Sequence, residues 1–384
     1  RQAGEAIATA EVVVGYGTYL DLVPDLLAGK EVIRTGMTQE VERARTACEH
    51  AHRGKTVALV SSGDAGIYGM AGPAYESLLQ SGWQPGQGIE VEVVPGITAL
   101  SACAALVGAP LTHDFCAISL SDLLTPWPVI ARRLDAAARG DFVIALYNPK
   151  SRRRQGQIAA AQRILLRYRD PATPVAIVEA AYREGQAVRL VSLAEMAASA
   201  IGMLATVLIG NGQTVCRDGL MATPRGYADK YEGPGGAVRP GEARGRPLSQ
   251  GLNGWQAGVR RALSEDAEPS IFAIAERYDV PLGEVLAAFS EVLPDASPVA
   301  FTTARVRAGT ETELLRAART WGRICLMVRA PGGAAAELRL DAADHRDFAV
   351  ANSYVGLVPR RSGAIDHTSI QDDDVEIRHP FVPV

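Results

Sequence analysis

Cysteine is scarce in this 384-residue chain and follows no regular spacing. The five cysteines are Cys48, Cys103, Cys116, Cys216 and Cys325, and no two of them form a Cys-x-x-Cys pair. This scatter argues against an iron–sulfur cluster or a structural zinc site, so we predict no metal site. It is also typical of reduced thiols, and we therefore expect a cytoplasmic protein.

Long apolar runs and an excess of positive charge are also missing. No run approaches the roughly 20 residues that a membrane-spanning helix needs, so we expect no membrane partner. The formal net charge is −4, which disfavours a nucleic-acid partner. The hydrophobic content of 47% instead indicates a globular protein, and the length suffices for two or three domains.

The chain also begins without a strand. Residues 1–10 have the pattern of a helix and lead directly into the apolar residues 11–14. The first residue is Arg1 rather than Met. We expect that an upstream strand and loop precede this sequence.

Apolar strand patterns alternate with helical patterns from residue 1 to about 230. Such alternation predicts an α/β architecture, and near-continuous apolar runs suit strands that are covered on both faces. The predicted strands are 12–16, 57–60, 89–94, 142–146, 175–178 and 204–209. The predicted helices are 39–53, 73–81, 99–106, 129–138 and 156–169.

Residues 232–252 are dense in Gly, Pro and Arg, which predicts a linker between two domains. The first domain would then be residues 1–231 and the second 253–384. The second is expected to be an α+β domain with a hairpin turn at Pro-Gly-Gly 331–333. Its predicted helices are 255–264, 270–278 and 281–292, and its predicted strands are 322–329 and 335–340.

Glycine-rich and polar segments follow the predicted strands of the first domain. The first is Ser61-Ser-Gly-Asp-Ala-Gly-Ile-Tyr-Gly-Met-Ala71, directly after strand 57–60. In open α/β sheets ligands bind at this edge, where loops from several strands can surround one molecule. By itself, the first segment fits an ordinary strand–turn–helix connection equally well. The others are 94–99, 146–150, 179–185 and 203–207.

The order and the amino-acid sequences of these segments resemble those of the tetrapyrrole (corrin/sirohaem) methyltransferase family over residues 1 to about 220. Within the family, the members that methylate C17 of precorrin-3B are the most similar. The matching segments are VVGYGTYL at 13–20, GDAGIYGMA at 63–71, VPGITA at 94–99, LYNPKSRRR at 146–154, YREG at 182–185 and TVLIGNGQT at 206–214. Two features differ: the family's first glycine-rich loop is absent, and Ala65 replaces the usual proline.

The resemblance implies a two-lobed α/β methyltransferase fold with an appended C-terminal α+β domain. It implies S-adenosylmethionine as methyl donor, and ring contraction of precorrin-3B to precorrin-4 in cobalamin biosynthesis. Family members resemble homodimers, so we expect a homodimer. The implied donor site consists of Ser62, Gly63, Asp64, Ile67, Thr98, Ala99, Tyr147, Asn148, Ala181, Leu204 and Ala205. Without the other segments, Asp64 would fit a turn or helix-capping aspartate better.

An acid/base side chain would help the ring contraction that the resemblance implies. The candidates are His113, Asp114, Lys150 and Glu184, with Tyr147 as a further one. A lone histidine is more often structural than catalytic. The basic run Lys150, Arg152, Arg153 and Arg154 suits a substrate with many carboxylates, and fits a solvated helix start equally well.

Segments 269–289 and 320–333 of the second domain faintly resemble the haem-utilisation (HutX/ChuX-type) family. This resemblance implies a tetrapyrrole-binding module, with His345, His367 and His379 as candidate axial ligands. Each of these histidines fits a surface position better. Three functions stay open: a precorrin-3B methyltransferase, a methyltransferase for another ring position or a cobalt-containing substrate, and a tetrapyrrole carrier or scaffold.

Overall fold

The computed structural model describes residues 1–151, 154–233, 236–265 and six strands beyond them. These residues belong to two compact units, Arg1–Arg225 and Gly226–Val384, and each is described by itself. The boundaries proposed at 231 and 253 stay a prediction. None of the helices in the described ranges has both the length and the apolar character needed to cross a membrane.

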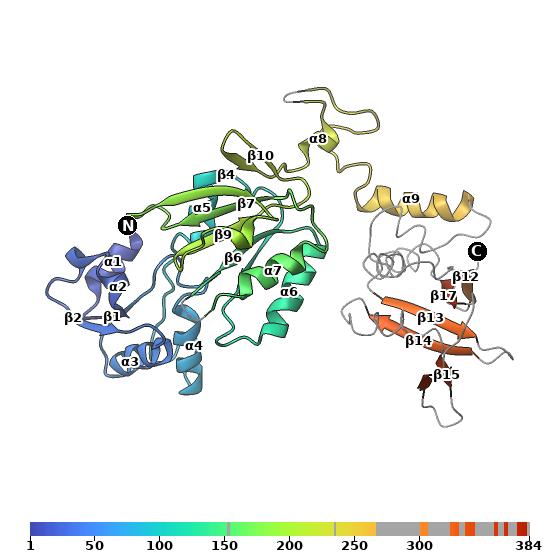
Figure 1. Cartoon of the computed structure of the whole chain (residues 1–384). Helices are drawn as coiled ribbons and strands as arrows, with labels where there is room; N and C mark the ends of the chain where they lie inside the picture. The colour runs from blue at the N-terminus through green and yellow to red at the C-terminus, as the bar shows by residue number, and fades with distance from the viewer. Residues whose placement is uncertain are drawn as a thin grey trace. The chain divides into compact units, whose positions relative to one another are not determined.

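The first unit begins with a three-stranded parallel sheet in the order β2-β1-β3 (Figure 1). Its central strand is buried on both faces, because successive side chains alternate across a strand. Val13 packs with Ile7 of α1, whereas Val12 and Val14 pack with Ala47 of α3. The elements of this lobe are α1 Gln2–Thr9, β1 Val12–Tyr16, α2 Gly17–Leu20, β2 Glu31–Thr35, α3 Glu40–His52, β3 Val57–Val60 and α4 Ala71–Gln80.

A five-stranded mixed sheet follows, in the order β5-β6-β9-β7-β8. Strands β5 and β6 are parallel, and β9 runs antiparallel to both of its neighbours, β6 and β7. Strands β6 and β7 therefore point in the same direction. The elements of this lobe are α5 Ala99–Val107, β5 Phe115–Ser119, α6 Trp127–Arg139, β6 Val143–Tyr147, α7 Gln157–Leu165, β7 Pro174–Glu179, β8 Ala187–Ser192 and β9 Ala205–Ile209.

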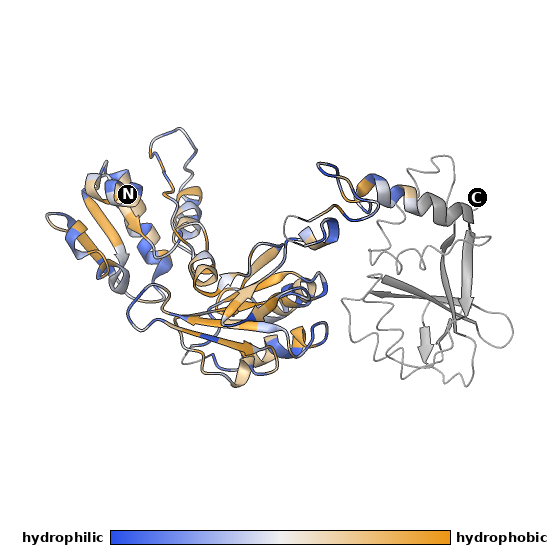
Figure 2. Ribbon diagram, turned by 90° about the horizontal axis from the view of Figure 1, so that it is seen from above, coloured by the Kyte–Doolittle hydropathy of each residue, from blue (hydrophilic) through white to orange (hydrophobic). Residues whose placement is uncertain are grey.

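Helices cover both faces of this larger sheet, which explains why its central strands are continuously apolar. Ile144 and Leu146 of β6 pack with α6 and α7 on one face. Ala145 packs on the other face with Leu100 and Cys103 of α5. In Figure 2 the strands of the first unit are accordingly largely orange, the colour of hydrophobic residues. The sheet is a rigid base from which loops can project.

Short elements complete the first unit. A small sheet has the order β10-β11-β4, in which β11 pairs antiparallel with β10 and parallel with β4. The bounds are η1 Pro24–Leu26, β4 Gly108–Ala109, η2 Met196–Ala198, β10 Val215–Arg217 and β11 Leu220–Ala222.

The second unit contains a four-stranded antiparallel sheet in the order β12-β17-β13-β14 and a separate pair, β15-β16. The predicted strands 322–329 and 335–340 correspond to β13 and β14, and helix 255–264 lies within α9. Helices 270–278 and 281–292, the turn at 331–333 and His345 lie outside the described residues, while His367 and His379 lie on β16 and β17. The bounds are α8 Tyr227–Lys230, α9 Leu252–Glu265, β12 Ala300–Arg305, β13 Arg323–Arg329, β14 Ala335–Asp341, β15 Leu357–Pro359, β16 Ile365–His367 and β17 Val375–Phe381.

The strand predicted at 89–94 is wrong. Its alternation of apolar and acidic residues suits a half-buried strand, but among the described residues no strand pairs with it. A strand forms only where a neighbour takes up its backbone hydrogen bonds. The Ile89 carbonyl instead accepts a hydrogen bond from the Trp83 indole at 2.7 Å. Conversely, β2, β5 and β8 were not predicted; each lies at an edge of its sheet and is less continuously buried than β6 or β9.

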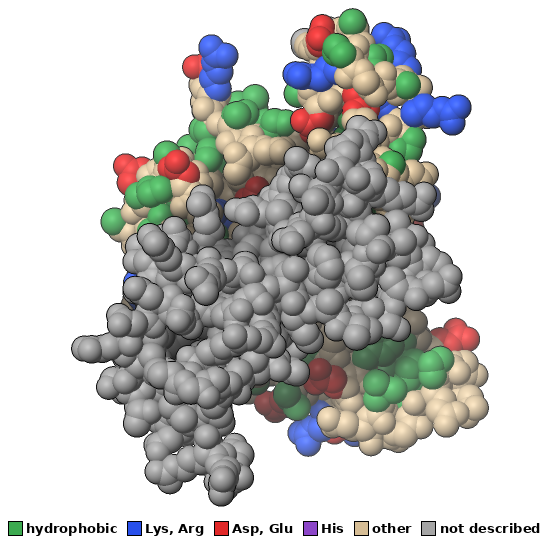
Figure 3. Space-filling view, turned by 90° about the vertical axis from the view of Figure 1, so that its right-hand side faces the viewer, with side chains coloured by type: hydrophobic (Ala, Val, Ile, Leu, Met, Phe, Trp, Pro, Cys, Tyr) green, Lys and Arg blue, Asp and Glu red, His purple; other side chains and the backbone are tan. Residues whose placement is uncertain are grey.

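Charges of both signs are mixed on the surface. On the face that Figure 3 shows, Lys and Arg side chains of the described residues lie among Asp, Glu and apolar side chains. The composition agrees, with 39 basic and 43 acidic residues.

Removal of a large side chain from the interface between α6 and the sheet should destabilise the first unit. Leu134 is fully buried there, and Leu134→Ala is expected to lower the free energy of unfolding by about 2–5 kcal/mol, measured by urea denaturation. Leu124→Ala is the matched control, because Leu124 is 92% exposed and should change stability by less than about 0.5 kcal/mol. Equal losses in the two variants would contradict this packing.

Candidate functional site

The loops that carry the predicted donor-site residues meet at one edge of the five-stranded sheet. The register pairs Leu146 with Val207 and Glu179 with Ala205. The end of β6, the end of β7 and the start of β9 therefore lie at the same edge. The predicted residues at these three strand ends are Tyr147, Asn148, Ala181, Leu204 and Ala205.

The loops 61–71 and 94–99 pack against each other through their backbones. A side chain on Gly96 would collide with the carbonyl oxygen of Gly63. Gly63 also has a φ of +74°, a conformation that side chains disfavour. These glycines are required because two stretches of main chain approach each other directly.

Asp64 joins the same two loops. Its carboxylate accepts one hydrogen bond from the Gly66 N–H at 2.8 Å and another from the Gly96 N–H at 2.9 Å. These bonds, with Gly96 contributing most, lower the pKa of the Asp64 carboxyl below its ordinary value. The structure thus shows Asp64 in a loop-holding role, and any contact between Asp64 and a ligand stays a prediction.

Tyr147 connects the edge of the sheet to α5. Its hydroxyl accepts a hydrogen bond from the Leu100 N–H at 2.8 Å and is also hydrogen-bonded to the Thr98 hydroxyl. Thr98 is the N-cap of α5 but makes no side-chain capping bond itself. The Tyr147 hydroxyl therefore satisfies one of the N–H groups that a helix leaves unpaired at its start.

Tyr68 fastens loop 61–71 to the larger sheet. Its hydroxyl donates to the Ala117 carbonyl of β5 at 3.0 Å, and its ring lies 4.9 Å from that of Tyr147. Partial burial raises the pKa of the Tyr68 phenol. Its φ of +54° is unusual for a residue other than glycine. Asn148, Ala180 and Tyr182 share this feature, so backbone strain is concentrated at this edge.

One residue of the basic run forms hydrogen bonds with other residues of the fold. Arg154 donates to the Asn148 carbonyl at 3.1 Å and to the Ser121 hydroxyl at 3.3 Å. The Asn148 side chain donates in turn to Ser119 Oγ at 3.1 Å. Lys150 lies in the same loop at the site edge, half-buried, whereas Arg152 and Arg153 lie outside the described residues.

Arg183 is a residue of this edge that we did not single out from the sequence. It follows β7, and its guanidinium donates to the Ser62 hydroxyl at 2.7 Å. Its neighbour Glu184, which was predicted, is exposed in the same loop. The matching segment YREG contains both residues, but only the folded chain shows that Arg183 contacts loop 61–71.

The structure does not bring His113 and Asp114 to this site. They precede β5, and the Asp114 carbonyl accepts a hydrogen bond from Val143 at the start of β6. Ser119 at the far end of β5 is five residues away, roughly 16 Å at about 3.3 Å per residue. Because both strands point toward the site, residues before them lie at the opposite edge. The structure therefore places these two residues away from the other predicted site residues, and a catalytic role for them stays a prediction.

Apolar side chains are unusually exposed around the site edge. Ile97 is 74% exposed, Leu204 67% and Tyr182 65%, and Ile67 is also exposed. Exposed apolar groups that gather beside polar backbone are typical of a binding surface. This edge therefore offers both main-chain hydrogen-bonding groups and apolar contact area to a ligand.

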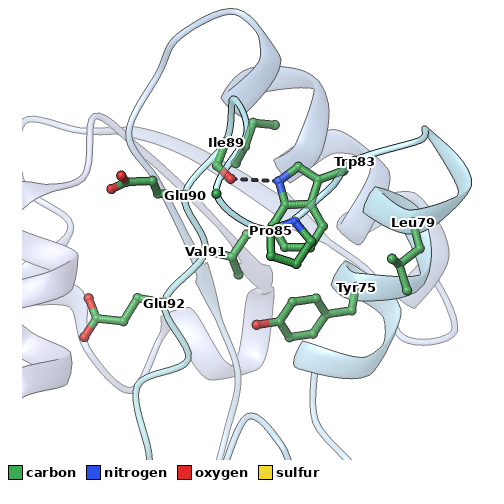
Figure 4. Close-up of a pocket in the computed structure, with 9 residues that line it drawn as sticks. Tyr75, Leu79, Trp83, Pro85, Ile89, Glu90, Val91 and Glu92 are labelled. Carbon is green, nitrogen blue, oxygen red and sulfur yellow. Dashed lines mark hydrogen bonds between the residues drawn. The ribbon is translucent and has the colours of Figure 1, made fainter.

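A separate hollow of about 780 Å³ lies beside α4 (Figure 4). The rings of Tyr75 and Trp83 are 6.1 Å apart there, while Glu90 and Glu92 point away from them. None of the predicted site residues lines it. Within the described part of the chain, no three His, Cys, Asp or Glu side chains gather in a way that would hold a metal ion.

Comparison with known proteins assigns the family. Residues 1–197, just over half of the chain, match the family described as tetrapyrrole (corrin/porphyrin) methylases. The chain belongs to this family. The crystal structure of the methyltransferase CobJ is similar, with a TM-score of 0.54 and 37% sequence identity over 57% of this chain and 91% of that one. The predicted α/β methyltransferase fold is thereby confirmed for the N-terminal part of the chain.

Two relatives show how much of the chain is shared. The cobalt-factor III methyltransferase of Priestia megaterium is 54% identical over 231 residues, which are 60% of this chain and 43% of that protein. The probable cobalt-factor III C(17)-methyltransferase of Salmonella typhimurium is 50% identical over 226 residues, 59% of this chain and 92% of that protein. The chain thus spans less than half the length of the first relative and most of the second.

A methyl group at position 96 should separate the two site loops. Gly96→Ala is expected to cost about 1–3 kcal/mol of stability, because the new Cβ collides with backbone that cannot move aside without displacing Gly63. Thermal unfolding measures the loss. Gly72→Ala is the matched control: the site is open, lies in α4, and should be neutral or more stable by up to about 1 kcal/mol. A neutral Gly96→Ala variant would contradict the observed contact.

The hydrogen bonds of Asp64 predict a pH-dependent contribution to stability. Its pKa is lower in the folded chain, so the contribution is complete above the ordinary value of 3.8 and is lost as the pH falls through the folded-state value. Asp64→Asn replaces one acceptor oxygen with a donor. The variant should be less stable at neutral pH, and the difference should shrink in acid.

Urea unfolding of both proteins between about pH 7 and pH 3 measures this difference. Glu76→Gln is a suitable control, because Glu76 is an exposed carboxyl on the neighbouring helix α4. A stability gap for Asp64→Asn that stays constant with pH would show that the charge on Asp64 has no role.

Proposed function

We propose that this chain transfers a methyl group from S-adenosylmethionine to C17 of a tetrapyrrole in cobalamin biosynthesis. The observation that supports it most strongly is the 54% and 50% identity to proteins named as cobalt-factor III methyltransferases. That identity extends over 231 and 226 residues, close to the length of the first unit.

The residues at the site edge fit the methyl donor. Gly63 and Gly96 are both exposed and carry no side chain, and such backbone can help to orient an ammonium and a carboxylate. Exposed Ile67 and Leu204 offer apolar contact for an adenine ring. The residues that would hold the donor are those predicted from the sequence: Ser62, Gly63, Asp64, Ile67, Thr98, Ala99, Tyr147, Asn148, Ala181, Leu204 and Ala205. When bound, the donor supplies an electrophilic methyl group on a sulfonium.

The contribution of the chain to such a transfer is chiefly alignment. Methyl transfer needs two reacting atoms in line, and holding them so can supply about 7–11 kcal/mol in favourable cases. Asp64 and Tyr147 keep the loops in place by bonds to backbone N–H groups. Exposed apolar residues would exclude water once a ligand covers them. Lys150 and Glu184 are the predicted acid/base residues that remain at this edge, and they are the candidates for the proton transfers of ring contraction.

Two substrates are candidates, and they differ in whether the tetrapyrrole contains cobalt. The similarity of the matching segments supports precorrin-3B, converted to precorrin-4. The names of the two relatives support cobalt-factor III, and they favour the cobalt-containing substrate. The predicted homodimer and the predicted tetrapyrrole-binding role of the second unit belong to the same proposal.

Incubation of the full chain with S-adenosylmethionine and each tetrapyrrole in turn tests the proposal. We expect the product to gain one methyl group by mass, to show the absorbance of a contracted ring, and to appear together with S-adenosylhomocysteine. Faster turnover of one substrate shows whether the enzyme prefers the metal-free or the cobalt-containing tetrapyrrole. Tight pigment binding without a mass change would instead support a carrier. The absence of both binding and turnover would overturn both functions. A reaction without the donor is the control.

A further inference from the structure

Arg183 is a charged group at the site edge without an acidic partner. Its guanidinium donates to the neutral Ser62 hydroxyl at 2.7 Å, and no described carboxylate forms an ion pair with it. A guanidinium has five N–H donors in a planar fork, so most of its donors stay available. By contrast, Arg189 on the next strand is paired with Glu179 at 3.2 Å.

The backbone around Arg183 holds it in a defined position. Ala180 and Tyr182 have φ values of +46° and +57°, conformations that persist only where the surroundings enforce them. The Tyr182 N–H donates to the Gln186 side chain at 2.7 Å, and the Arg183 N–H donates to the Ala180 carbonyl at 2.9 Å. The turn is therefore built from hydrogen bonds that do not involve the guanidinium.

The contact with Ser62 directs this charge toward the donor loop. Ser62 precedes Gly63 and Asp64, whose backbone meets the second loop. Asp64 itself is already bonded to Gly66 and Gly96, so its carboxylate is engaged elsewhere. The free donors of Arg183 thus lie beside uncovered main chain, where a ligand anion would find a charged, bidentate partner.

We propose that Arg183 binds a carboxylate group of the ligand at this edge, and that Ser62 orients its guanidinium. This inference rests on the proposed function, in which both ligands carry carboxylates. One source is the amino-acid end of the methyl donor, and the other is the acidic side chains of the tetrapyrrole. The chemistry is the same for both: a planar guanidinium fork on a carboxylate.

Calorimetry and kinetics on the full chain can separate the two sources. Arg183→Met is compared with wild type for binding of S-adenosylhomocysteine and of 5′-methylthioadenosine, which lacks the amino-acid end. If Arg183 holds the donor, S-adenosylhomocysteine should bind about tenfold more weakly and 5′-methylthioadenosine unchanged. If Arg183 holds the tetrapyrrole, both affinities should stay the same and the KM for the tetrapyrrole should rise about tenfold.

Further variants exclude a merely structural effect. Arg183→Lys keeps the charge without the fork and should recover part of the loss. Added salt should weaken ligand binding to wild type more than to Arg183→Met, since an ion pair is screened. Arg217→Met, an exposed arginine on β10, is the matched control and should bind and turn over like wild type. The Tm of Arg183→Met should match wild type.

The outcomes distinguish this inference from the function on which it rests. An active wild type together with an unchanged Arg183→Met would overturn the role of Arg183 alone. A wild type that neither binds S-adenosylhomocysteine nor turns over would overturn the proposed function, and the role of Arg183 with it.

Discussion

The direct approach of two backbone segments is the constraint on which the site depends. Loops 61–71 and 94–99 meet at Gly63 and Gly96, where no side chain fits between them. The first loop follows the three-stranded sheet, and the second leads into the helix that covers the five-stranded one. Contact between these loops therefore joins the two lobes. Asp64 reinforces the contact with hydrogen bonds to both sides.

Side-chain hydrogen bonds then hold the loops against the larger sheet. Tyr68 bonds to β5, Tyr147 bonds to the start of α5, and Arg183 bonds to Ser62. Each of these contacts joins residues at least 47 positions apart in the sequence. Together they arrange the predicted site in the free chain, and such preorganisation reduces the ordering that ligand binding requires.

Apolar strands were predicted well from the sequence because each one is a continuous run of apolar residues. Strands β1 and β3 have the predicted bounds, and β6, β7 and β9 differ by a residue at one end or both. Strands β1, β6, β7 and β9 are buried on both faces, so nearly every side chain must be apolar. Strand β3 lies at the edge of its sheet and is only partly buried, but it is also continuously apolar. The edge strands β2 and β8 were missed, since both contain exposed positions and charged residues that interrupt the apolar run. Segment 89–94 failed for the opposite reason: its pattern suits a strand, but pairing depends on a partner far away in the chain.

The motif order by itself determined the family, the α/β fold and the loops in which a site is predicted, because glycines and short polar runs after apolar strands are local features. Tertiary structure alone decided which residues share an edge. Strand direction brings Tyr147 and Ala205 together and sends His113 and Asp114 to the opposite end of β5. The contact of Arg183 with Ser62 joins residues 121 positions apart, and no local pattern records it. Spacing along a chain reveals local conformation, whereas the distance between chemical groups depends on how the strands are ordered and paired.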